Sequence, residues 1–310
     1  MRDSVPEPRK VPGYSLRQLL YFVTVAEEGS VSAASAKLSV SPSAVSLALS
    51  ELERALQSQL CVRRKAHGVT LTVSGTQLLH LARALLRQAR ELESELTSAD
   101  GRLSGPLAIG SFQGLASLVL PRLLQGFGQL HPGVVIDFEE RDQTELQQRL
   151  IAGKLDLVVL YDVSRSPEVD GVELTRLRPY LLLSVEHRLA REPKVALRDI
   201  AREPMVLCQE PPSLDYSLGL CRNAGVTPVI RYRVRSGETA RALVAHGLGY
   251  AIMMRRPPND RSLDGLPVVY KEIADLPRVD VPVLLGWPRD IRVTRRAEAF
   301  VRYSREALNG

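Results

Sequence analysis

The sequence has few cysteines and no long apolar run, and both absences restrict the class of protein. Cys61, Cys208 and Cys221 stand far apart without CxxC spacing, which argues against a disulfide framework or a zinc site. A reducing cytoplasm is therefore expected. No apolar stretch approaches the ~18–20 residues that cross a bilayer, so we predict no membrane association. The polar, proline-rich start, residues 1–13, has no signal-peptide core behind it and is predicted to be a disordered tail.

Sequence signatures of catalysis are also missing. The chain contains no GxSxG, HExxH, P-loop or EF-hand motif, and Gly247-Leu248-Gly249 lacks the third glycine of a dinucleotide fingerprint. The five histidines are scattered along the chain. These absences favour a binding protein over an enzyme, with no cofactor and no metal.

What the chain does have is an uneven distribution of charge. Residues 1–90 hold twelve Lys or Arg and six Asp or Glu, whereas residues 91–310 hold 29 of each kind. The whole formal net charge of +6 therefore lies in the first third of the protein. A basic module on an electrically balanced remainder indicates an anion-binding head, and nucleic acid is the first polyanion to consider.

Residues 14–72 have the pattern of three short helices. The first is indicated by apolar residues on one predicted helical face, namely Leu16, Leu19, Leu20, Val23 and Ala26. Ser30 or Ser32 can cap the second helix, and Ser41 followed by Pro42 is a strong start for the third. The predicted buried stripe of the third helix is Val45, Leu49, Leu52 and Leu56. Two short helices joined by a tight turn describe a helix–turn–helix, and the alternative is a plain three-helix packing motif with a solvated serine-rich face.

A basic hairpin is predicted directly after these helices. Apolar residues alternate at Leu60, Val62, Val69 and Leu71, on either side of Arg63-Arg64-Lys65-Ala66-His67-Gly68. Gly68 suits the positive φ of a tight turn. Three positive charges at the tip of such a β-wing can contact phosphates or enter the minor groove. A solvated charge run is the alternative, but the position after a helix–turn–helix favours DNA contact.

Residues 73–103 are predicted to form a long linker helix. Ser74 and Gln77 have capping-box spacing. The apolar positions repeat at intervals of four and three residues, at Leu78, Ala82, Leu85, Ala89, Leu92, Leu96 and Ala99. Arg83, Arg87 and Arg90 mark the predicted exposed side. A heptad seam of this length indicates a dimerising helix, and the alternative is an amphipathic helix that lies on its own domain.

Residues 104–310 read as an α/β body with mostly parallel sheets. Predicted strands lie at 106–110, 134–140, 155–161, 180–185, 205–208, 229–234, 250–254 and 281–287. Helical patterns lie between most of them, at 115–129, 142–152, 213–223 and 238–246. The size of the body predicts two subdomains that cross at 161–166 and 273–281. Subdomain I would hold residues 104–162 and 275–310, and subdomain II residues 163–274.

Ligands of such folds bind at the carboxyl ends of strands and against helix N-termini. The residues at these places are the predicted effector contacts: Ser111, Phe112, Gln113, Tyr161, Asp162, Gln209, Tyr216 and Ser236. Local capping is the alternative for each cluster, and capping is expected at Ser111 and Ser236 in any case. A polar or anionic organic effector is predicted, although Asp162 and Glu210 would repel an anion if they faced it.

In its order of parts the chain resembles the LysR-type transcriptional regulators. The resemblance covers roughly residues 14–305 and is carried by LRQLLYFVTVAEEGSVSAASAKLSVSPSAVSLALSELE, VRRKAHGVTLTVSG, LPRLLQGFGQLHPGVVIDFEE, LIAGKLDLVVL and ALVAHGLGYAIMM. It implies a winged helix–turn–helix, a homodimer through the linker helix, a homotetramer, and an effector-binding body of two Rossmann-like subdomains similar to periplasmic binding proteins. It also implies that Ser32, Ser41, Ser43, Ser46 and Arg63 face DNA, and that Ser111, Gln113, Tyr161, Gln209 and Ser236 face the effector.

The helix pattern, the hairpin and the resemblance together predict a set of contacts to double-stranded DNA. The set is Ser30, Ser32, Ser41, Ser43, Ser46, Leu47, Ser50, Arg54, Arg63, Arg64, Lys65 and His67. The sequence departs from the family pattern in three places. Leu47-Ala48-Leu49 stands where polar residues usually follow the recognition-helix serine, which leaves few hydrogen-bond donors for base edges. Gln57 replaces a glycine usual before the wing, and Cys61 replaces a common phenylalanine.

The sequence therefore predicts a cytoplasmic, sequence-specific transcriptional regulator whose DNA binding responds to a small organic effector. The alternative from another class is a solute-binding protein of the periplasmic type, for which the body alone would serve. An α/β enzyme is the third reading, opposed by the missing catalytic motifs.

Overall fold

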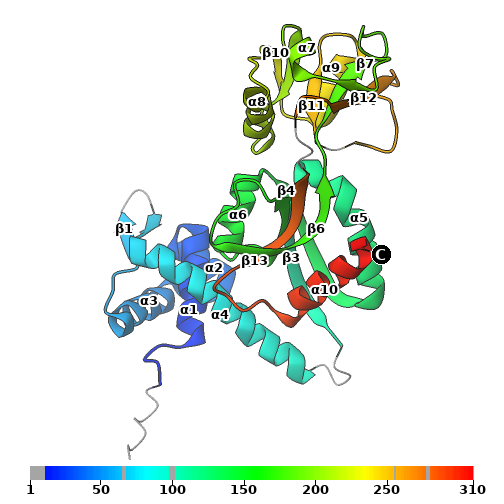
Figure 1. Ribbon diagram of the computed structural model, residues 1–310. Helices are drawn as coiled ribbons and strands as arrows, with labels where there is room; N and C mark the ends of the chain where they lie inside the picture. The colour runs from blue at the N-terminus through cyan, green and yellow to red at the C-terminus, as the bar shows by residue number, and fades with distance from the viewer. Residues whose placement is uncertain (1–10, 65–67, 98–101, 255, 277–279, 310) are drawn as a thin grey trace, which may run out of the picture. The chain divides into compact units, whose positions relative to one another are not determined.

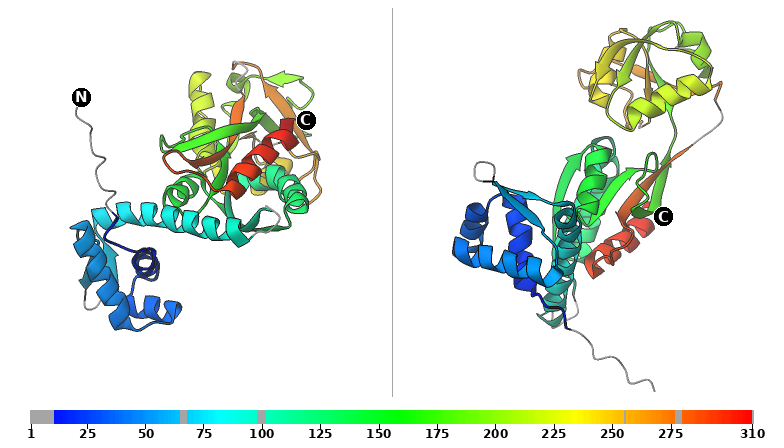
Figure 2. Two further views of the ribbon diagram at one scale, coloured as in Figure 1. Left: turned by 90° about the horizontal axis from the view of Figure 1, so that it is seen from below. Right: turned by 90° about the vertical axis from the view of Figure 1, so that its left-hand side faces the viewer.

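The computed structural model describes residues 11–64, 68–97, 102–254, 256–276 and 280–309 (Figures 1 and 2). The chain divides into two compact units, one ending at Ala99 and the other beginning at Asp100. Most of the predicted N-terminal tail and the wing-tip residues Lys65 and His67 lie outside the described residues. No helix in the described ranges is both long and apolar enough to span a bilayer.

Three helices and a β-hairpin make up most of the first unit. The helices are α1 (Leu16–Glu28), α2 (Val31–Leu38) and α3 (Pro42–Leu56), and the hairpin strands are β1 (Cys61–Arg64) and β2 (Gly68–Leu71). The predicted caps are confirmed at Ser30 and Ser41, whose hydroxyls accept from the amides of Ala33 and Ala44. The stripe of Val45, Leu49 and Leu52 on α3 is buried in the core of the unit, as predicted.

The predicted apolar face of α1 is confirmed at Leu19 and Val23 and wrong at Leu16 and Leu20. Leu16 and Leu20 are exposed, whereas Phe22 and Val25 are buried with Leu19 and Val23. The helix begins in the capping box of Ser15 and Gln18, which places Leu16 in the first turn, beyond the core. The predicted set is therefore shifted toward one edge of the buried face, and its last member, Ala26, still packs against the core.

A glycine fits the hairpin closely against the turn between α1 and α2. The amide of Val69 donates to the carbonyl oxygen of Gly29 at 2.7 Å. The φ of Gly68 is +72°, as predicted, and a Cβ at this position would lie 2.3 Å from the same oxygen. Only glycine fits both the backbone conformation and this contact. The outer end of the wing, where Val69 and Gly68 stand opposite Arg63 and Arg64, is thereby held against the turn between α1 and α2.

The long helix α4 (Val73–Thr97) begins before the predicted capping box. The amide of Gly75 donates to the hydroxyl of Thr72 at 3.0 Å, so Thr72, rather than Ser74, caps the helix. Leu79 and Ala82 are buried in the core of the first unit. Arg83 was predicted to be exposed but its side chain is 7% exposed, because its Nη2 pairs with Oε1 of Glu27 at 2.9 Å. The beginning of α4 therefore belongs to the head, as the alternative reading held for that part.

The first subdomain of the body is built on a five-stranded sheet of order β4-β3-β5-β13-β6. The strands are β3 (Ser104–Phe112), β4 (Gly133–Arg141), β5 (Leu157–Tyr161), β6 (Val169–Leu177) and β13 (Val281–Pro288). Strands β3, β4 and β5 are parallel, and β13 is antiparallel to its neighbours. The helices α5 (Gln113–Leu130), α6 (Gln143–Ile151) and α10 (Arg295–Asn309) pack on this sheet.

The second subdomain holds a four-stranded sheet of order β11-β7-β12-β8 and a parallel β9–β10 pair. Its strands are β7 (Tyr180–Ser184), β8 (Lys194–Val195), β9 (Pro204–Cys208), β10 (Val229–Val234), β11 (Ala251–Met253) and β12 (Val268–Ile273). Its helices are α7 (Leu197–Ile200), α8 (Ser213–Asn223) and α9 (Gly237–Ala245). A bridge between Met205 and Tyr250 joins the pair to the end of β11.

All eight predicted strands and four predicted helices of the body are confirmed, but two expectations are wrong. The sheets are mixed rather than mostly parallel, because β13 and β7 run antiparallel to the strands beside them. The first crossing does not lie at 161–166, because β6 continues in the first sheet, paired with β13. The chain crosses after Leu177, where Arg178 Nε pairs with Asp280 Oδ1 at 2.7 Å.

Candidate functional site

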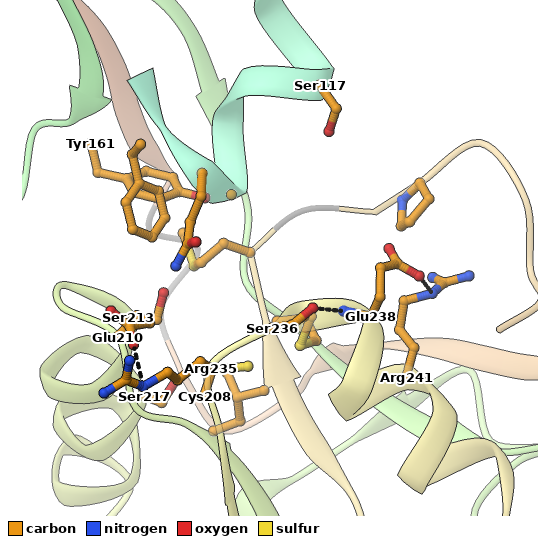
Figure 3. A pocket seen from close by; sticks show the side chains of 18 of the residues that line it. Ser117, Tyr161, Cys208, Glu210, Ser213, Ser217, Arg235, Ser236, Glu238 and Arg241 are labelled. Carbon is orange, nitrogen blue, oxygen red and sulfur yellow. Dashed lines mark hydrogen bonds and ion pairs between the residues drawn. The ribbon is translucent and has the colours of Figure 1, made fainter. Parts of the chain in front are cut away.

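A cavity of about 340 Å³ lies in the body, lined by residues of both subdomains (Figure 3). The first subdomain contributes the end of β3 and the start of α5, with Tyr161 at the end of β5. The second contributes the end of β9 and the first turns of α8 and α9. The rings of Phe112 and Tyr161, with centroids 5.6 Å apart, form one apolar wall. The cavity thus lies where strand ends and helix N-termini meet, as predicted for an α/β ligand site.

Three helix N-termini border the cavity, and two of them have no side-chain cap. Phe112 precedes α5 and Pro212 precedes α8, and neither side chain accepts a hydrogen bond from the helix amides. Ser236 does cap α9, where its hydroxyl accepts from the amide of Glu238 at 3.2 Å. The first amides of a helix carry a partial positive charge and lack partners within the helix. The cavity can therefore satisfy hydrogen-bond acceptors of a ligand at α5. At α8 the amides of Ser213 and Leu214 already donate to the carbonyl oxygen of Glu210.

Charged side chains of both signs line the same cavity. Arg235 Nε lies 3.3 Å from Glu210 Oε1, and Arg241 Nε lies 3.4 Å from Glu238 Oε2. Arg241 is 1% exposed, and its guanidinium also donates to Asn259, Arg261 and Tyr270. Both arginines thus have protein partners, but Arg241 Nε is buried without a hydrogen bond. The cavity is polar, and its lining carries more carboxylates than guanidinium groups because Glu140 also faces it.

Ser217 lines this space, and its side chain carries a hydroxyl group. It lies one helical turn beyond Ser213 on α8, and both residues line the cavity. Ser217 is 4% exposed, and its hydroxyl makes no hydrogen bond with any residue that the structure describes. Its Oγ remains accessible, so a ligand or water in the cavity can hydrogen-bond to it.

Burial also changes the chemistry of the nearby thiols. Cys208 lines the cavity, and burial raises the pKa of its thiol to about 11. Burial, with a smaller contribution from the Asp275 carboxylate, raises the pKa of Cys221 on α8. Both thiols are therefore protonated near neutral pH, and the thiolate is the nucleophilic form.

The structure brings four of the eight predicted effector contacts together. Phe112, Gln113, Tyr161 and Ser236 line the cavity, whereas Ser111, Asp162, Gln209 and Tyr216 do not. Ser111 is fully buried and donates to the carbonyl of Phe112, so the expectation that it caps α5 is wrong. Asp162 pairs with Arg165 at 2.9 Å. Tyr216 packs against the hydrophobic cores of both subdomains.

Several lining residues were missed by the sequence reasoning. They include Ser117, Ser213, Ser217, Arg235, Glu238 and Arg241. Ser117, Ser217 and Arg241 each lie four residues after the first residue of a helix, on its second turn. That spacing places a side chain on the same face as the helix start. These three residues could therefore have been predicted by extending the candidate site one turn beyond each predicted helix start.

In the head, most of the predicted DNA contacts lie on the surface. Ser32, Ser41, Ser43, Leu47, Ser50 and Arg54 are exposed, and Ser30 and Ser46 are half-buried. Arg63 and Arg64 lie in β1, opposite Val69 and Gly68. Five of the eight exposed or half-buried residues are on α3, the second helix of the helix–turn–helix. Such motifs place this helix in the major groove.

A capped helix–turn–helix with a β-wing, followed by a long helix and a two-subdomain body with a polar cavity, defines a ligand-responsive transcriptional regulator. Residues 16–76 match the family described as bacterial regulatory helix-turn-helix protein, lysR family. Residues 100–309 match the LysR substrate binding domain. The chain belongs to the LysR family of DNA-binding transcriptional regulators, and the resemblance seen in the sequence is confirmed.

Similar proteins span nearly the whole chain. The crystal structure of HinK, a LysR family regulator from Pseudomonas aeruginosa, is 36% identical and covers 95% of this chain and 99% of its own, with a TM-score of 0.63. The DNA-binding transcriptional dual regulator OxyR of Escherichia coli is 30% identical over 294 residues, which are 92% of this chain and 94% of OxyR. The C-terminal domain of a probable LysR family regulator from Rhodococcus sp. RHA1 is 38% identical and covers 65% of this chain and 99% of its own, with a TM-score of 0.64. A regulator, rather than a solute-binding protein, is what these matches support.

Proposed function

We propose that the protein binds operator DNA as a homodimer, with α3 in the major groove and the wing on the flanking phosphates. A small polar effector in the body cavity then changes how the two heads sit on DNA. The observation that carries this proposal is a polar cavity, lined by residues of both subdomains, in a chain whose separate head holds the whole net charge. We place the protein in the cytoplasm and propose that dimers pair further into tetramers.

The dimer is proposed to form through the outer part of α4. Three leucines on this helix are exposed, Leu81 at 63%, Leu85 at 39% and Leu92 at 62%. Their spacing of four and seven residues puts them on one side of the helix. Leu79 and Ala82, by contrast, are already covered by the head. On a helix of 25 residues, this exposed row of leucines can pack against the same row of a second copy.

The effector is proposed to be a small organic molecule with both hydrogen-bond acceptors and donors. Acceptors, such as a carboxylate, suit the uncapped amides at the start of α5. Donors suit Glu140, which lines the cavity and has no ion pair with any described residue. The hydroxyl of Ser217 can serve either group. A ligand with one kind of group alone would leave part of this lining unsatisfied.

Substituting Ser217 with leucine is expected to abolish the effector response. The added carbons occupy the cavity and the hydroxyl is lost, so we expect the effector affinity to fall at least tenfold. The DNA affinity without effector should stay within twofold, because the head is a separate unit. The measurement is thermal shift of the full chain against a panel of amino acids and small organic acids, followed by gel shift. Asn223→Leu, at the exposed end of the same helix, is the matched control. Hits that bind both variants equally would place the effector elsewhere.

Hydrogen peroxide is expected to leave DNA binding unchanged, in contrast to what the names of some relatives suggest. Several are called hydrogen peroxide-inducible genes activators. In this chain burial raises the pKa of Cys208 to about 11, which keeps its reactive thiolate scarce until the pH approaches that value, and burial also raises the pKa of Cys221. Alkylation of the folded protein, read residue by residue by mass spectrometry, should accelerate at Cys208 only as pH rises into that range. A disulfide between Cys208 and Cys221 formed by peroxide at neutral pH would contradict this.

A further inference from the structure

Four residues of α3 form an exposed stripe that we call the α3 stripe: Ser43, Leu47, Ser50 and Arg54. Their offsets of four, seven and eleven residues put them on one side of the helix, and all four are exposed. The opposite side, with Val45 and Leu49, is buried in the core of the head. The α3 stripe is therefore the surface that α3 can present to DNA.

The hydroxyls of the α3 stripe are engaged within the head. Ser43 Oγ lies 3.0 Å from Ser41 Oγ, and Ser41 also accepts from the amide of Ala44. Ser50 Oγ donates to the carbonyl of Ser46 at 3.1 Å. Arg54 remains as a long donor, but it lies in the last turn of the helix. The N-terminal and middle turns, which contact base edges in such motifs, thus offer little for direct hydrogen-bond readout.

Leu47 occupies the middle of the α3 stripe and has no structural role in the head. It is 60% exposed and is absent from the residues that form or flank the head core. Exposed single leucines are ordinary on protein surfaces, but this one stands where the polar readout would be. In the major groove, the one apolar group that identifies a base is the C5-methyl of thymine.

We propose that Leu47 is a specificity-determining residue that reads thymine methyl groups in the operator. The inference rests on the proposed DNA binding through α3. Hydrophobic burial of one methyl group favours binding by roughly fourfold. A dimer that makes one such contact in each half-site would therefore prefer thymine over a base without the methyl by roughly fifteenfold.

The test removes the methyl group from the DNA and the leucine from the protein separately. The operator is first selected from a random duplex pool by the full chain. It is then synthesised with thymidine or with deoxyuridine, which pairs alike but lacks the C5-methyl. Dissociation constants of the wild type and Leu47→Ala are measured on both duplexes. We expect the wild type to lose roughly fifteenfold on the deoxyuridine duplex, and Leu47→Ala to bind both duplexes equally.

Leu16→Ala is the matched control, because Leu16 is an exposed leucine on α1 outside the α3 stripe, and it should discriminate like the wild type. Equal discrimination by the wild type and Leu47→Ala, or none by the wild type, would overturn the role of Leu47 while leaving DNA binding in place. A pool that yields no enriched sequence would instead overturn DNA binding itself, and this inference with it.

Discussion

A chain carrying Leu85→Asp is expected to sediment as a monomer and to lose operator binding. Leu85 lies in the middle of the exposed leucine row on α4, between Leu81 and Leu92. In the proposed dimer the substitution buries two unpaired carboxylates, one from each copy. Each costs several kcal/mol, so the dimer should weaken by at least on the order of a thousandfold. Operator affinity then falls with it, because one head alone makes half of the contacts.

Two variants separate this effect from a general loss of folding. Thr76→Asp adds the same charge to the same helix at an exposed position on the side opposite the leucine row, and it should sediment as the wild type does. Leu85→Ala removes the side chain without adding a charge and should weaken the dimer less than the aspartate does. Leu85→Asp that still dimerises through α4 at wild-type affinity would refute the proposed interface.

Replacing both Arg63 and Arg64 with alanine should give the second large effect. Both residues lie in β1 of the wing, next to the tip. Each phosphate contact that is lost makes the plot of log association constant against log salt concentration shallower by about 0.9. Two contacts in each subunit of a dimer would lower the slope by roughly 3.6 and the affinity near 0.1 M salt by on the order of a thousandfold.

The measurement is operator affinity across a range of salt concentrations. Arg231→Ala with Arg233→Ala removes the same charge from β10 of the body, where both side chains are exposed. That control should keep the wild-type salt dependence of operator affinity. Any change that both variants share would reflect the loss of net charge alone. A wing variant whose slope equals that of the wild type would remove Arg63 and Arg64 from the interface.

The head was the most predictable part because its signals are local. Ser41 followed by Pro42 fixed the start of α3, and the φ of Gly68 follows from its place in a tight hairpin. The misplaced features depend on distant partners. The charge pattern of the sequence predicts that Arg83 is a surface residue, and only the fold brings Glu27 to it. The phase of α1 likewise depends on which side the neighbouring helices cover.

The body shows the same division between local and distant signals. Strand β6 has no clean alternation and contains Gly171, so its pairing with β13, more than a hundred residues away, was not visible and the crossing was misplaced. Strand ends predicted Phe112, Gln113, Tyr161 and Ser236 correctly as neighbours in space. Arg241 was missed because its role comes from Asn259 and Tyr270, which only the tertiary structure places around it.

DNase footprinting of the DNA upstream of the adjacent gene tests the central claim most directly, with the full chain and with and without candidate small organic acids. The account predicts protection of two half-sites spaced by about one helical turn or a multiple of it, on one face of the duplex. An effector that binds the cavity should alter the extent of protection or the pattern of enhanced cleavage, and Ser217→Leu should give the footprint without that change. A full-length dimer that protects no DNA at about 0.1 M salt, or a footprint that every cavity-binding acid leaves unaltered, would contradict it.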